Sequence, residues 1–205
     1  MSDLNQALAE ISAIRAQVAR DTQFRGYGPA SIAVSGVLAL MVAAVQGHWS
    51  REIGAEFMRF LVIWVGTAAV AVTLTAGETI IRARRVHSGF ASEMIQAAVE
   101  QFLPALVIGF LLTGVFLRVA PQQVWMLPGL WELIFSLGVF ASCRFLPRQM
   151  FIVGVWYLAA GLTCLMWGSA SKALSPWEMG IPFGVGQLMV AAVLHCCFEE
   201  SVEEQ

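Results

Sequence analysis

Charged side chains are scarce in this sequence. Asp, Glu, Lys and Arg together make up 13% of its 205 residues, whereas an average soluble domain carries about 25%. The formal net charge is −2, and the basic residues stand in small groups between apolar runs instead of gathering on one face. This distribution excludes the basic surface that nucleic-acid binding requires, and we expect no nucleic-acid partner.

The motifs of the common enzyme classes are also missing. The sequence contains no Walker loop, no Rossmann glycine fingerprint, no GxSxG elbow and no HExxH pair. Its four cysteines form no CxxC pair and no extracellular disulfide framework. We therefore expect a non-enzymatic protein without a cofactor.

Long apolar runs are abundant instead. The sequence is 58% hydrophobic, and its mean hydropathy is +0.72. Runs of roughly 20 residues, the length that crosses a bilayer, lie near residues 29–46, 60–77, 102–120, 129–146, 150–167 and 180–197. Unpaired backbone groups are costly in lipid, so such runs must be helical. The prediction is an all-α fold: a polytopic transmembrane helical bundle of six spans arranged as three hairpins.

The fourth run is the weakest of the six. Glu132 and Arg144 lie near its ends, and Pro147 stops it early. A bundle of only five spans would place the two termini on opposite sides of the membrane. With six spans, the chain divides into a cytoplasmic amphipathic helix over residues 1–22, a membrane domain over 23–198 and an acidic cytoplasmic tail over 199–205.

Basic residues in the short loops predict the orientation. Eight of them fall on the side of the N-terminus (Arg15, Arg20, Arg25, Arg82, Arg84, Arg85, Arg144 and Arg148) and four on the other (Arg51, Arg59, Arg118 and Lys172). Since basic loops stay in the cytoplasm, we expect a protein of the bacterial inner membrane with both termini on the cytoplasmic side. The interface-seeking tryptophans support this alternation, because five lie at predicted outer ends: Trp49, Trp125, Trp131, Trp167 and Trp177.

An amphipathic helix is predicted before the first span. Leu4, Leu8, Ile11, Ile14 and Val18 recur at three- and four-residue steps within residues 2–20. Three surfaces can cover its apolar face: membrane lipid, the cytoplasmic end of its own bundle, or a partner helix in another protein or a second copy. Arg82, Arg84 and Arg85 on the same side could contact lipid headgroups, or serve only as positive-inside anchors.

Small residues recur at helical spacing on three runs. The stripes comprise Ser31, Ser35, Ala39 and Ala43; Ala69, Thr73 and Gly77; and Gly180 with Gly184. Such stripes let helix backbones approach closely in lipid. They predict packing within the bundle or, alternatively, a dimer interface.

The middle of each span is expected to lack ionisable side chains, which disfavours a carboxylate-driven transporter. Gln187 is the most central strongly polar residue. It could line a neutral solute path together with Thr67, Thr113 and Thr163. Alternatively, these side chains bond to neighbouring helices and backbone carbonyls as packing contacts.

Two further groups of polar residues are weak candidates for ligand sites. His195, Cys196 and Cys143 could bind a soft metal near the cytoplasmic face, but ordinary packing at the helix ends explains them equally. No metal is predicted. On the outer side, His48, Glu56, Glu132 and Trp131 could surround a cationic ligand, or they could be ordinary interfacial residues.

These observations favour an interaction, accessory or regulatory module that works through its cytoplasmic face. The alternative is a channel or facilitator for a small solute or ion with a neutral polar lining around Gln187.

Overall fold

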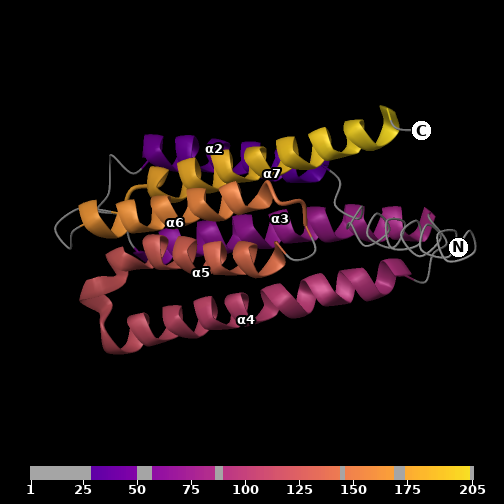
Figure 1. Cartoon of the computed structure of the whole chain (residues 1–205). Helices are drawn as coiled ribbons and strands as arrows, with labels where there is room; N and C mark the ends of the chain where they lie inside the picture. Colours follow the sequence, from indigo (N-terminus) through magenta and orange to yellow (C-terminus); the bar gives the residue numbers. More distant parts are fainter. Residues whose placement is uncertain (1–28, 50–56, 86–89, 144–145, 169–173, 204–205) are drawn as a thin grey trace, which may run out of the picture.

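The computed structural model describes residues 29–49, 57–85, 90–143, 146–168 and 174–203. Over these residues the chain is helical: α2 (Pro29–Trp49), α3 (Phe57–Arg85), α4 (Phe90–Val119), the 3₁₀ helix η1 (Pro121–Met126), α5 (Leu127–Ser142), α6 (Met150–Trp167) and α7 (Trp177–Glu203). The α-helices lie side by side with their long axes roughly aligned (Figure 1). The prediction of an all-helical bundle is confirmed for this part of the chain. The amphipathic helix predicted over residues 2–20 lies outside it.

Within the described residues, five segments are long and apolar enough to cross a membrane: Pro29–His48, Phe57–Glu78, Pro121–Ser142, Met150–Trp167 and Trp177–Cys196. The apolar part of α4, Leu103–Val119, is shorter. Its 17 residues rise about 26 Å in a helix, against roughly 30 Å of hydrocarbon. The described helices are therefore consistent with a multi-pass membrane protein, and among them the apolar part of α4 falls short of a full crossing.

Among the apolar segments of the described residues, the fourth differs most from its predicted span. We expected residues 129–146, but the helical segment begins earlier, with η1 at Pro121, and α5 ends at Ser142. Pro121 and Pro128 each lie at the first or second position of their helix, where a missing N–H costs nothing. At the other end, Pro147 disfavours helix in the residue before it.

The other predicted spans end within three residues of the apolar segments in the structure. α6 covers the predicted residues 150–167, whereas α3 continues past the predicted residue 77 to Arg85 and α4 begins at Phe90, before the predicted residue 102. α7 begins three residues before Gly180 and continues through Glu203, into the stretch predicted as a separate acidic tail.

The first and last helices of this part of the chain, α2 and α7, form one of the two largest interfaces. They run antiparallel, because Gly36 faces Gln187 while Ala43 faces Gly180. A Cβ added to Gly36 would lie only 2.9 Å from the Gly184 carbonyl oxygen. Part of the small-residue stripes predicted on these two helices therefore packs within the bundle.

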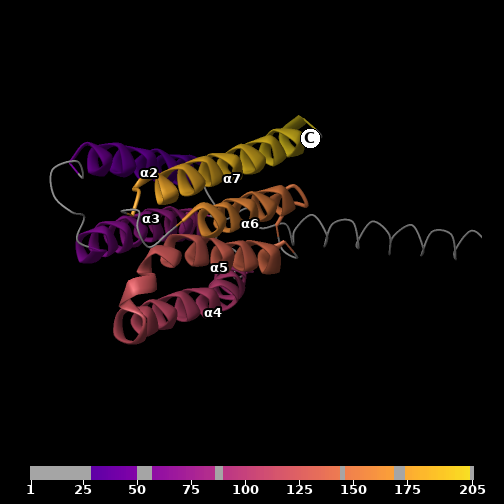
Figure 2. The same cartoon turned by 90° about the vertical axis from the view of Figure 1, so that its left-hand side faces the viewer.

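The other large interface joins α5 and α6. A Cβ added to Gly129 would lie 2.8 Å from the carbonyl oxygen of Gly161, and the reverse distance is also 2.8 Å. Further along, the buried Ser136 hydroxyl donates to the Gly154 carbonyl over 3.0 Å. Helix pairs α2–α7 and α5–α6 lie side by side in both views (Figures 1 and 2). The predicted hairpins α2–α3, α4–α5 and α6–α7 make smaller interfaces.

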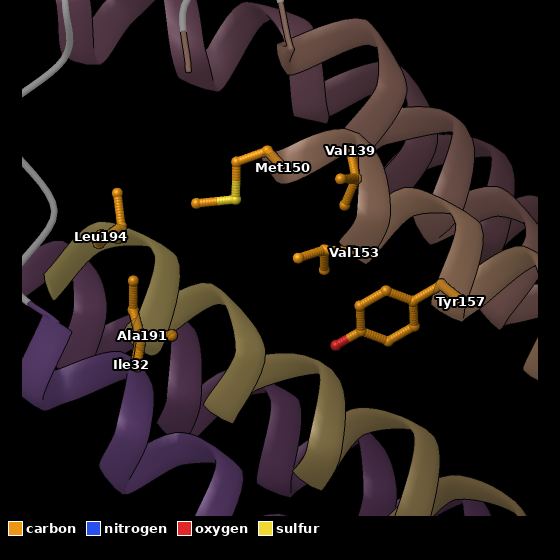
Figure 3. Packing of buried hydrophobic residues seen from close by; sticks show 7 residues of the cluster. All are labelled: Ile32, Val139, Met150, Val153, Tyr157, Ala191 and Leu194. Atoms are coloured by element: carbon orange, nitrogen blue, oxygen red, sulfur yellow. The ribbon is translucent and has the colours of Figure 1, made fainter. Parts of the chain in front are cut away.

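The main core lies between these two pairs. Its buried members are Ile32, Val139, Met150, Val153, Tyr157, Ala191 and Leu194, and Figure 3 shows them converging from α2, α5, α6 and α7. A second buried cluster joins α2, α3 and the start of α7 through Ala43, Phe60, Trp64 and Met179.

The outward faces of α3 and α4 are apolar and exposed. Phe110 is 78% exposed, and Val62 and Leu106 are also exposed. Soluble monomers rarely expose contiguous apolar surface on this scale, whereas lipid is a suitable medium for it. The exposed residues belong to the apolar runs from which membrane spans were predicted.

Candidate functional site

A buried carboxyl on α5 is the most unusual polar feature of the described structure. Glu132 is fully buried, with 0% of its surface exposed. It lies inside the membrane-length segment Pro121–Ser142. The sequence prediction started this span at residue 129, which put Glu132 near its end, whereas the segment Pro121–Ser142 places Glu132 further inside.

Two glycines position this carboxyl. Gly129 precedes Glu132 by three residues on α5, and Gly161 precedes Cys164 by three on α6. Residues three apart share a helix face, so the close contact between the two glycines brings Glu132 and Cys164 together. The Cys164 sulfur lies 4.0 Å from Glu132 Oε1. Neither Cys164 nor this pairing was predicted; the matched Gly-x-x-Glu and Gly-x-x-Cys spacings are the signal that could have revealed it.

A proline in α7 supplies a second acceptor for the same thiol. Pro182 lacks the N–H that would bond to the Glu178 carbonyl, four residues earlier. Cys164 Sγ lies 3.8 Å from that carbonyl oxygen. A thiol has one hydrogen to donate, so Cys164 can donate to either Glu132 or the Glu178 carbonyl at one time. The Pro182 carbonyl, in turn, accepts from the Trp156 indole over 3.0 Å.

Two buried oxygens near this site have no hydrogen-bond partner among the described residues. They are Oε2 of Glu132 and the hydroxyl of Tyr157. The two side chains are close enough to interact electrostatically. Tyr157 packs edge-on against Phe135, with 4.7 Å between ring centroids, and its hydroxyl end lies against Gly186 of α7.

The site lies near one end of the bundle. Cys164 is three residues from the last residue of α6, and Glu178 is the second residue of α7. The Trp125 ring lies against Gly168, and Trp177 lies against Gly47 near the end of α2. We call this the tryptophan end: it comprises η1, the starts of α5 and α7, and the last turns of α2 and α6.

The residues of the predicted outer ligand site do not gather around one point. Glu132 faces α6, whereas the Trp131 indole donates to Thr113 of α4 over 3.0 Å. His48 is exposed on α2. Glu56 lies outside the described residues. The structure thus directs Trp131 and Glu132 toward different helices, as consecutive helical residues require.

The four residues of the predicted solute path lie on four different helices. Thr67 donates to the Ile63 carbonyl over 2.8 Å, and Thr113 donates to the Gly109 carbonyl over 2.7 Å. Thr163 is exposed on α6. Gln187 lies close to Tyr157, and its Cβ would be 3.1 Å from a Cβ on Gly36. The hydroxyls of Thr67 and Thr113 thus donate to carbonyls of their own helices.

The predicted metal candidates are also separate. The Cys143 thiol donates to the Val139 carbonyl in its own helix over 3.3 Å, while His195 and Cys196 are exposed on α7. Among the described residues, no group of three or more His, Cys, Asp or Glu side chains could hold a metal ion. Arg82, Arg84 and Arg85 occupy the last turn of α3; their side chains lie outside what the structure describes.

Comparison of the chain with protein-family models, with curated proteins and with solved structures found no match.

Proposed function

We propose that this chain is a non-enzymatic protein of the bacterial cytoplasmic membrane that acts as an interaction, accessory or regulatory module. The observation that carries the proposal is the filled interior between α2, α5, α6 and α7. Tyr157 and Val153 are fully buried there, and direct glycine contacts close the α2–α7 and α5–α6 interfaces. A domain packed in this way suits a stable membrane-embedded body better than a solute path.

In this proposal six helices cross the membrane, and both termini lie in the cytoplasm. The excess of arginine on one side supports the orientation. So does the tryptophan end, where Trp167 is 68% exposed and Trp177 is 43% exposed, as befits indole rings at headgroup depth. α4 completes its crossing with flanking residues or local thinning of the bilayer, at a modest energetic cost.

The working surface in this proposal is the cytoplasmic face. It comprises the amphipathic residues 2–20, the Arg82 to Arg85 turn and the acidic end of α7. Lipid, a second copy or a partner protein would cover the apolar side of residues 2–20, because such a face is unstable in water.

The test compares the full chain with a variant lacking residues 2–20, both expressed in the native membrane. After gentle detergent extraction, the size of the complex is measured by chromatography with light scattering. We expect a smaller complex for the deletion variant, while the control Gln187→Leu keeps the full size. Equal sizes for the full chain and the deletion variant would refute an interaction through this segment.

The competing facilitator reading is tested separately in reconstituted vesicles. If Gln187 lined a path, Gln187→Leu would lower the flux of any solute that the full chain carries. Our proposal predicts no flux for either protein. Flux that depends on Gln187 would replace the module by a facilitator.

A further inference from the structure

Among the residues that the structure describes, no cation is found facing the Glu132 carboxyl. Its Oε1 lies 4.0 Å from the Cys164 sulfur, and its Oε2 has no partner among the described residues. The titratable groups that face it are Cys164 and Tyr157 from α6 and Glu178 from α7. None of the three carries a positive charge.

A carboxylate in such surroundings is costly. Removing a charge from water costs several kcal/mol even after relaxation, and ionisable side chains within membrane helices are retained chiefly where they function. A neutral carboxyl avoids that cost and needs only hydrogen bonds. Its two oxygens then differ, since one accepts from a donor and the other carries the proton.

We propose that Glu132 is a proton-binding site inside the α5–α6–α7 bundle. Oε1 accepts a hydrogen bond from the Cys164 thiol, and Oε2 carries the proton. The carboxyl releases this proton to a water molecule, which leaves a carboxylate and hydronium, and it is reprotonated by hydronium, so no other reactant is needed.

The surroundings provide a short connection to the membrane surface. The Cys164 sulfur lies between Glu132 and the Glu178 carbonyl, which is 3.8 Å from it. Glu178 is half-buried in the first turn of α7, beside the partly exposed Trp177. Cys164 is partly exposed and Glu132 is fully buried, so water arriving from this end would meet Cys164 before Glu132.

Infrared spectroscopy of the full chain in lipid nanodiscs tests the proposal directly. A protonated carboxyl absorbs at a higher frequency than a carboxylate, and the band shifts when the protein is moved into heavy water. At neutral pH we expect such a band in the wild type. It should be lost in Glu132→Gln and kept in Glu100→Gln, which removes an exposed carboxyl of α4.

Absence of the band from the wild type would overturn the proposal, and so would its persistence in Glu132→Gln. Should that variant fail to assemble, Cys164→Ala identifies the band instead. Removing the thiol that bonds to Oε1 should shift its frequency. A wild-type band that neither loses intensity in Glu132→Gln nor moves in Cys164→Ala belongs to another carboxyl and refutes the assignment.

Discussion

The bundle contains two closely packed helix pairs that are built alike and enclose different chemistry. In α2–α7, Gly36 and Gly184 allow the backbones to touch, and the side chains nearest to them are those of Gln187, Leu188 and Leu40, none of them ionisable. In α5–α6, Gly129 and Gly161 do the same, but the next turn holds a buried carboxyl and a thiol. Close glycine packing is thus a general solution for helices in lipid. The polar pair beside it is specific to α5–α6 and is the feature that suggests a function.

Enlarging a glycine at the α5–α6 contact should give the largest effect. Gly161→Val places side-chain atoms where a Cβ alone would already lie 2.8 Å from the Gly129 carbonyl oxygen. We expect a loss of about 3 kcal/mol or more in the free energy of unfolding, measured by denaturation in detergent micelles. Gly66→Val is the control, since no atom lies within 4 Å of a Cβ there. Equal losses in the two variants would contradict the packing described for α5–α6.

The α2–α7 pair should respond to a smaller change. Gly36→Ala adds one methyl group 2.9 Å from the Gly184 carbonyl oxygen and 3.1 Å from the Gln187 Cβ. We expect a destabilisation of about 1–3 kcal/mol. The same assay on Gly77→Ala, a position with open space around it, should show little change. If Gly36→Ala were neutral, the close contact between α2 and α7 would be excluded.

Removing the buried hydroxyl between α5 and α6 should cost less again. Ser136 is fully buried and donates to the Gly154 carbonyl of the neighbouring helix. Ser136→Ala should lower the free energy of unfolding by about 1 kcal/mol. Thr73→Val is the control, because its exposed hydroxyl bonds only within its own helix; its effect should stay within about 0.5 kcal/mol.

The attachment of α4 provides the smallest expected effect. The Trp131 indole donates to the Thr113 hydroxyl over 3.0 Å. A double-mutant cycle with Trp131→Phe and Thr113→Val should give a coupling energy of about 0.6 kcal/mol, the average for hydrogen bonds between membrane helices. A coupling of zero would mean that the two side chains do not interact in the membrane.

Hydropathy and helix signals predicted the positions of individual helices better than they predicted which helices pack together. The run over residues 150–167, located by hydropathy, coincides with α6. The fourth span was displaced because the apolar run continues through Cys143 to Leu146, whereas α5 ends at Ser142. Sequence neighbours usually pack together, which favoured three hairpins. The α2–α7 contact joins distant parts of the chain and could be suspected only from the matching small-residue stripes.

Most of the candidate site could not be predicted from the sequence. Glu132 was noticed, but its burial depends on α6 and α7 covering it, and hydropathy does not say which helix lies against which. Cys164 was overlooked, since a single cysteine in an apolar run resembles any small hydrophobic residue. Pro182 leaves the Glu178 carbonyl without its intrahelical donor. That this carbonyl lies beside Cys164 can be recognised only once α6 is known to pack against α7.

The central claim is that lipid surrounds the apolar faces of these helices. Its most direct test is to wash membranes containing the chain with alkaline carbonate and then to extract them with detergent. We predict that the chain stays with the lipid during the wash and enters solution only with detergent. A folded, monomeric chain released into plain buffer would contradict the account.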